Sequence, residues 1–190
     1  MTHNAMIDLL ATRRSVAPLQ MKGPAPDASE TEMLLTLATR VPDHGKLAPW
    51  RFIIFSGEAR AHAGEHFAAI HQKKNPDASA EALESERMRF QNTPLVIGVV
   101  SKAAPHPKIP VWEQELSAGA VCMTMIIAAN AMGFVTKWLT EWIAFDKDVS
   151  AALGLEAHER FAGFIHIGRM TEKPAERERP RVADLVTYFK

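Results

Sequence analysis

The spacing of apolar residues along the chain predicts a mixture of helices and strands. Apolar positions recur at the helical period in a short N-terminal stretch that ends near Arg13, and again in a stretch that begins after Asp27. Glu30 follows Asp27 by three residues, the spacing of a capping box, so Asp27 is the expected N-cap of the second helix. The predicted buried face of this helix consists of Met33, Leu34, Leu37, Ala38 and Val41.

Uninterrupted apolar runs predict the strands. Residues 50–55 are aromatic and β-branched, which favours a strand. Residues 95–100 lack polar alternation, which is typical of a central strand covered on both faces. Further strands or extended segments are expected over 134–140 and 161–167, surface helices over 58–71 and 80–92, and a short helix over 146–153.

The longest predicted helix covers residues 112–132. Ser117, Gly119, Thr124 and Asn130 interrupt its apolar residues, so it is expected to be a buried core helix and a poor membrane span. The chain ends in a second apolar run, residues 185–189, which needs a covering surface. A partner subunit is one candidate for that surface.

Composition narrows the classes of function. A chain of 190 residues, 47% apolar and 23% charged, fits one globular domain over residues 1–190. Its zero net charge argues against nucleic acid or an anionic membrane as a bulk electrostatic partner. Cys122 is the only cysteine, which leaves no intramolecular disulfide and no thiolate zinc cluster, and the N-terminus does not resemble a signal peptide. We therefore expect a cytoplasmic protein.

Two basic clusters are the main candidates for chemistry. Arg13-Arg14-Ser15 closes the first predicted helix, and Arg40 and His44 close the second. The chain has no glycine-rich phosphate loop, so a phosphorylated ligand would have to be held by side chains, and guanidinium groups suit that contact. Taken alone, such a cluster is more often a solvated basic helix end, which the helix dipole favours.

The clusters and the segments after them resemble one known family in order and spacing. Arg13-Arg14-Ser15, Arg40-x-Pro42-Asp43-His44 and Pro49-Trp50 are similar to motifs of the nitroreductase family of flavoproteins, in its short YdjA-like branch. The later motifs of the resemblance are residues 112–120, Gly133-Phe134, Trp138, Gly163-Phe164, Gly168 and residues 186–189. The resemblance implies an α+β fold with a central mixed β-sheet flanked by helices, assembled as a domain-crossing homodimer.

The same resemblance implies the cofactor and its contacts. FMN would be the bound cofactor, with NADH or NADPH as electron donor and a nitroaromatic, quinone or similar small molecule as acceptor. No side chain is predicted to act as a catalytic acid or base, and neither a metal nor a membrane is expected. The implied FMN contacts are Arg13, Arg14, Ser15, Trp138, Leu139 and Thr140, together with Arg40 and His44 from the other subunit of the dimer.

One departure from the family concerns the flavin's N1/O2 edge. Many relatives carry a cation shortly after the serine, where it stabilises the reduced flavin and raises its potential. Ala17 and Pro18 occupy those places here, so we expect a flavin that is harder to reduce, unless Lys22 or Lys137 replaces the cation.

Two other functions remain open from the sequence. One is an FMN-binding protein without reductase turnover. The other is a zinc hydrolase, because His62, Glu65 and His66 match the H-x-x-E-H pattern of some zinc peptidases.

Overall fold

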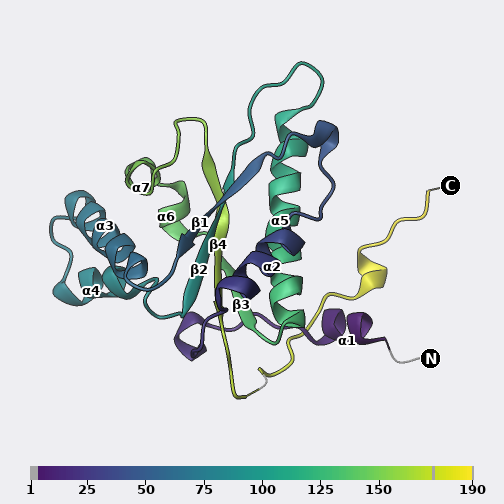
Figure 1. Ribbon diagram of the computed structural model, residues 1–190, viewed down its shortest axis with the longest axis horizontal. Coiled ribbons are helices and arrows are strands. Elements are labelled where there is room, and N and C mark those ends of the chain that lie inside the picture. The colour runs from purple at the N-terminus through teal and green to yellow at the C-terminus, as the bar shows by residue number, and fades with distance from the viewer. Residues whose placement is uncertain (1–3, 173, 190) are drawn as a thin grey trace.

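A four-stranded sheet forms the centre of the molecule (Figure 1). The computed structural model describes residues 4–172 and 174–189. The strands are β1 (Trp50–Phe55), β2 (Leu95–Ser101), β3 (Val135–Leu139) and β4 (Arg160–Gly168), in the spatial order β1-β2-β4-β3. β2 is buried along its whole length, which confirms the prediction of a central strand.

The sheet differs from the expected mixed sheet in strand direction. All three pairs of neighbouring strands are antiparallel. The parallel pairing found among the described residues is an isolated bridge between Ser15 and Thr136 at the β3 edge. Apolar runs do not record strand direction, because parallel and antiparallel strands that are covered on both faces have the same pattern. The α+β class itself is confirmed.

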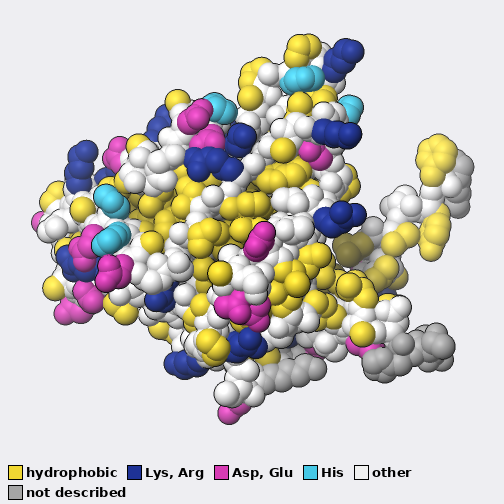
Figure 2. Space-filling view, viewed as in Figure 1, with side chains coloured by type: hydrophobic (Ala, Val, Ile, Leu, Met, Phe, Trp, Pro, Cys, Tyr) yellow, Lys and Arg dark blue, Asp and Glu magenta, His cyan; other side chains and the backbone are white. Residues whose placement is uncertain are grey.

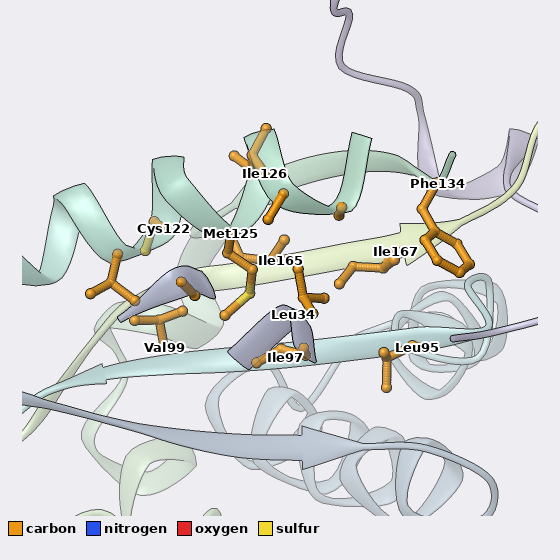
Figure 3. Close-up of a cluster of buried hydrophobic side chains, with 14 of the residues drawn as sticks. Leu34, Leu95, Ile97, Val99, Cys122, Met125, Ile126, Phe134, Ile165 and Ile167 are labelled. Carbon is orange, nitrogen blue, oxygen red and sulfur yellow. The ribbon is translucent and has the colours of Figure 1, made fainter. Parts of the chain in front are cut away.

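Helices cover both faces of the sheet. α2 (Ala28–Ala38) and α5 (Val111–Ala131) lie on one face. Figure 3 shows Cys122, Met125 and Ile126 of α5 packed over the strands, beside Leu34 of α2. On the other face, Phe67 of α3 and Phe90 join aromatic side chains of β1 and β4. The helices of that face are α3 (Ala59–Lys74), α4 (Ala80–Met88), α6 (Glu141–Phe145) and α7 (Lys147–Ala152).

The two ends of the chain extend from this body. α1 (Ala5–Thr12) has no buried residue, and its side chains Met6, Ile7 and Leu10 are exposed. The C-terminal segment, with the short 3-10 helix η3 (Val182–Asp184), leaves the body beside α1 (Figure 1). Figure 2 shows it standing away with hydrophobic side chains at its end, where Tyr188 and Phe189 are exposed. Within one chain these apolar residues stay in contact with solvent.

α2 is shorter than its hydrophobic pattern predicts. The capping box of Asp27 and Glu30 is present, but the helix ends at Ala38. Leu34 and Ala38 are buried as expected, whereas Met33 and Leu37 are exposed in the single chain. The other short helices are the 3-10 turns η1 (Pro18–Gln20) and η2 (His44–Lys46). None of the described helices has the length and apolar character that spanning a membrane requires.

A partly buried ion pair joins β1 to the residue before β4. Arg51 donates from Nε and Nη2 to the two carboxylate oxygens of Glu159, at 2.8 and 2.6 Å, and Nη2 also donates to the carbonyl of Gly154. The Glu159 side chain is almost fully buried. The hydrogen bonds from Arg51 lower the pKa of Glu159 from 4.5 to about 2.

We expect this pair to make the chain sensitive to acid. A lowered carboxylate pKa contributes stability that is present above pH 4.5 and is lost as the pH falls through the folded pKa of about 2. The contribution is on the order of 3 kcal/mol, at about 1.4 kcal/mol per pKa unit. Between these pH values, the free energy of unfolding from denaturant titration should fall less steeply in Glu159→Gln than in the wild type.

The control is Glu65→Gln, which removes an exposed carboxylate of α3. Its stability profile should run parallel to that of the wild type over the same range. Parallel profiles for Glu159→Gln and the wild type would contradict the assignment.

Candidate functional site

The first basic cluster lines a cavity where α1, α5 and β3 meet. Arg13 is the C-cap of α1, and the residues that follow it run toward the edge strand β3. Arg13 and Arg14 are both half-buried and both line a cavity of about 320 Å³, together with Asn130 and Val135. Residues 170–172 and Pro174, which follow β4, close its other side. Two guanidinium groups on one concave surface favour an anionic ligand.

Arg14 has an unused donor inside this cluster. Its Nη1 donates to Glu176 at 2.5 Å, but its Nε is buried and has no hydrogen-bond partner among the described residues. Buried donors are nearly always paired, so an unpaired guanidinium N–H beside a cavity is typical of a ligand contact.

The chain then runs along β3. Ser15 is exposed and forms the bridge to Thr136, and Val16 donates its N–H to the Thr136 carbonyl at 3.0 Å. Asn130 at the end of α5 donates to the Thr136 hydroxyl at 3.0 Å. These bonds fix the basic segment against the strand that ends in Trp138 and Leu139.

Trp138 is held by the neighbouring strand. Its indole Nε1 donates to the carbonyl of Ala162 at 3.1 Å, and the ring remains about one-third exposed. A Cβ on Gly163 would lie 2.0 Å from that nitrogen, so only glycine leaves room for this indole position. Thr140, half-buried, follows β3 as the N-cap of α6.

The second basic cluster lies in the strained loop that contains η2. Gly45, Lys46 and Ala48 all have positive φ, which is uncommon for the two residues with side chains. The carboxylate of Asp43 holds the loop by accepting the N–H groups of Leu47 at 3.1 Å and Ala48 at 2.9 Å. Strained backbone supported in this way is often found at binding sites.

The side chains of this loop face the beginning of α5. His44 Nδ1 lies 2.7 Å from Glu113 Oε2, and Ser117 donates its hydroxyl to the Pro42 carbonyl at 2.6 Å. These four residues line a second cavity of about 340 Å³. Arg40 lies two residues beyond the end of α2 and is exposed, so it is outside the helical turn in which the sequence placed it.

The two clusters lie at opposite ends of α5. Asn130 lines the Arg13 cavity and Ser117 lines the His44 cavity. These two helix positions are thirteen residues apart, which corresponds to about 20 Å at about 1.5 Å per residue. Figure 1 shows α1 near one end of α5 and the η2 loop near the other. One chain therefore brings six of the eight predicted contact residues to the α1–β3 side and leaves Arg40 and His44 apart.

A third cavity lies farther along β3, and the sequence did not indicate most of its residues. Its volume is about 400 Å³, and Lys137 and Leu139 of β3 line it together with Pro18. Arg89 and His166 complete its basic side. Arg89 is 48 positions from Lys137 in the sequence, and the strand pairing of β3 with β4 is what places His166 opposite Lys137. No local pattern could have joined these three residues.

The H-x-x-E-H segment has a different environment. His62 and His66 are exposed on α3, and Glu65 forms an ion pair with Arg87 of α4. Within residues 4–172 and 174–189, no three His, Cys, Asp or Glu side chains are grouped so that they could hold a metal ion. The arrangement gives the zinc-hydrolase alternative no support.

Cys122 is buried within α5, as its apolar surroundings predict. Burial raises the pKa of its thiol to about 12. The thiol is therefore protonated at neutral pH and unreactive.

Comparison with known proteins identifies the family. The sequence profile of the Nitroreductase family matches residues 10–169. YdjA of Escherichia coli strain K12, classed by name with the NAD(P)H nitroreductases, is 32% identical over 96% of this chain and 98% of its own length. A Haemophilus influenzae protein with the same class name is 36% identical over 96% of this chain and 98% of its own length.

A solved structure has the same fold. The nitroreductase-like family protein from Bacillus cereus superposes with a TM-score of 0.81 at 21% identity, covering 100% of this chain and 98% of that one. The fold, the ordered motifs along the chain and the two full-length relatives agree. This chain belongs to the nitroreductase family.

Proposed function

We propose that the protein is an FMN-dependent NAD(P)H oxidoreductase that reduces nitroaromatic, quinone or similar small acceptors. The observation that carries the proposal is the Arg13–Arg14 cavity with the buried, unpaired Nε of Arg14. Family membership supports the redox chemistry. A Bacteroides fragilis nitroreductase whose structure contains FMN has the same fold, with a TM-score of 0.71 at 16% identity over 99% of this chain and 100% of that one.

The residues present fit an FMN phosphate and its polar chain. Arg13, Arg14 and the exposed hydroxyl of Ser15 would hold the phosphate and ribityl groups, in the charge-assisted geometry that guanidinium groups favour. Trp138, Leu139 and Thr140 would contact the flavin along the end of β3. Bound flavin supplies the hydride transfer between nicotinamide and acceptor, so the protein needs only to bind, orient and shield the reactants.

The proposal includes a homodimer with two shared sites. α5 exposes an apolar stripe at helical spacing, in which Trp112 is 67%, Leu116 54% and Met123 37% exposed. Between them, Gly119 has open space where a Cβ would be, which permits close approach of another helix. A second copy, related by a two-fold axis that crosses α5, would place the His44 end of its own α5 beside the Arg13 end of this chain's α5.

That arrangement accounts for the separation of the two clusters. Arg40 and His44 of each chain would then contact the cofactor held by Arg13 of the other chain. The exposed apolar residues of α1 and of the C-terminal segment would gain a covering surface in the same dimer. Placement in the cytoplasm, expected from the single cysteine, belongs to this proposal as well.

The visible spectrum of the purified protein tests the cofactor. We expect the absorption bands of oxidised flavin, and FMN in the supernatant after denaturation. Reconstitution with excess FMN that leaves the protein colourless would contradict the proposal, above all if stoichiometric zinc were found.

Addition of NADH or NADPH under anaerobic conditions then tests turnover. Bleaching of the bound flavin, followed by recovery of its colour on addition of a quinone, is the expected result. A flavin that neither nucleotide bleaches would favour the alternative of an FMN-binding protein without reductase activity.

A further inference from the structure

The cavity lined by Lys137 lies farther along β3 than the Arg13 cavity. Val135 lines the Arg13 cavity, and Leu139 lines the third cavity. The two residues are four positions apart, about 13 Å along β3 at about 3.3 Å per residue. Alternation along the strand places Val135, Lys137 and Leu139 on the same face. A ligand whose phosphate lies at Arg13 would therefore reach the third cavity with its other end.

The two cations that line this cavity differ in their ion pairing. Arg89 donates to both carboxylate oxygens of Glu86, at 2.8 and 2.7 Å, and forms a second ion pair with Glu141. Lys137, by contrast, has no ion pair with any residue in the part of the chain that the structure describes. Its ammonium group is therefore a cation on the cavity wall that no carboxylate of the described residues pairs with directly.

The third basic side chain adds no charge at neutral pH. His166 is buried, and its Nδ1 lies 3.1 Å from the Thr93 hydroxyl. Burial lowers the pKa of His166 to about 4, and the nearby charges of Arg89 and Lys137 add to the effect. The imidazole is therefore neutral at pH 7, and Lys137 is the cation of the cavity wall that has no ion pair among the described residues.

We infer that Lys137 is the cation that stabilises the reduced flavin in this chain, replacing the basic residue that is missing at Ala17 and Pro18. The inference rests on the proposed function, because it takes FMN as the ligand. Lys22, the other candidate, is exposed, and its backbone pairs with Arg169 in a bridge beyond β4. Lys22 does not line the third cavity. A positive charge near the N1/O2 edge favours the anionic reduced flavin over the neutral oxidised form.

The test compares the affinities of Lys137→Gln for oxidised FMN and for FMN reduced with dithionite. We expect the variant to lose at least about tenfold in its preference for the reduced form, which lowers the two-electron potential by about 30 mV. Spectroelectrochemistry of the FMN-loaded protein measures the same shift independently. Lys137→Arg, which keeps the charge, should restore most of the preference, and Lys22→Gln should match the wild type.

The outcomes separate this inference from the proposed function. Equal losses of affinity for both redox forms, or an unchanged potential in Lys137→Gln, would overturn the role of Lys137 while FMN binding stands. A shift of the same size in Lys22→Gln would overturn it too. A wild-type chain that binds FMN in neither redox state would overturn the proposed function, and the inference with it.

Discussion

A mixed dimer of one Arg13→Ala chain and one His44→Ala chain is expected to keep one intact flavin site. Within a chain the two residues lie at opposite ends of α5, so each site would take Arg13 from one subunit and His44 from the other. One site of the mixed dimer then carries both defects, and the other carries neither. Equal amounts of freely exchanging chains give about half mixed dimers, so about a quarter of wild-type sites should return.

The measurement is flavin bound per subunit after exchange, at an FMN concentration that saturates the wild type but neither parent. Loss of a charge-assisted phosphate contact in Arg13→Ala should weaken binding by about 1.5–3 kcal/mol, on the order of tenfold to 150-fold. Arg87→Ala, at an exposed ion pair of α4, should bind FMN as the wild type does.

A second mixture shows that recovery requires the shared geometry. Arg13→Ala chains mixed with chains carrying both Arg13→Ala and His44→Ala form mixed dimers in which every site lacks Arg13. No binding should return in that mixture. If the first mixture recovers no more flavin than the second, although the chains demonstrably exchange, the site lies within one chain.

Replacement of Gly64 by alanine is expected to destabilise the chain strongly. Gly64 is buried in α3 where that helix crosses α4. A Cβ at this position would lie 2.0 Å from the carbonyl oxygen and 2.8 Å from the carbonyl carbon of Arg87. Both atoms belong to helix backbone, so no rotamer change relieves the contact and the helices must separate.

The size of the loss follows from two opposing effects. Alanine gains about 1 kcal/mol over glycine in helix propensity. Overpacking of a close-packed contact typically costs about 1–3 kcal/mol, and a backbone contact belongs at the upper end. We expect a net loss of about 2 kcal/mol in the free energy of unfolding, measured by denaturant titration.

The control is Ala69→Ser on the exposed face of the same helix, which should change stability by less than about 0.5 kcal/mol. A Gly64→Ala chain as stable as the wild type would show that α3 and α4 do not approach this closely. The glycine in the middle of the H-x-x-E-H segment would then be unexplained by packing.

Local patterns in the sequence predicted most of the secondary structure. The capping box of Asp27 and Glu30, the aromatic strand at residues 50–55 and the continuous apolar run at 95–100 all form the predicted elements. Each is an interaction within a few residues or a periodicity along one element, so it can be read without the rest of the chain. The order of short motifs likewise sufficed to identify the family.

Strand direction and surface exposure depended on contacts between distant segments. The sheet is antiparallel because β2 and β4 pair in opposite directions, and an apolar run has the same pattern in either direction. Met33 and Leu37 have core-like spacing but are exposed in one chain. Hydrophobic periodicity alone does not distinguish core residues from apolar residues on the surface of a chain.

The candidate site, too, was predictable from the sequence in part and depended on the tertiary structure for the rest. The sequence by itself determined which basic residues to consider, because Arg13-Arg14-Ser15 and the segment from Arg40 to His44 are contiguous motifs. Only the tertiary structure decided that these motifs lie about 20 Å apart along α5, and that Lys137, rather than Lys22, lines a cavity with Arg89 and His166. The physical reason is that electrostatic and steric interactions depend on distance in space, and helix packing and strand register set that distance between residues far apart in the chain.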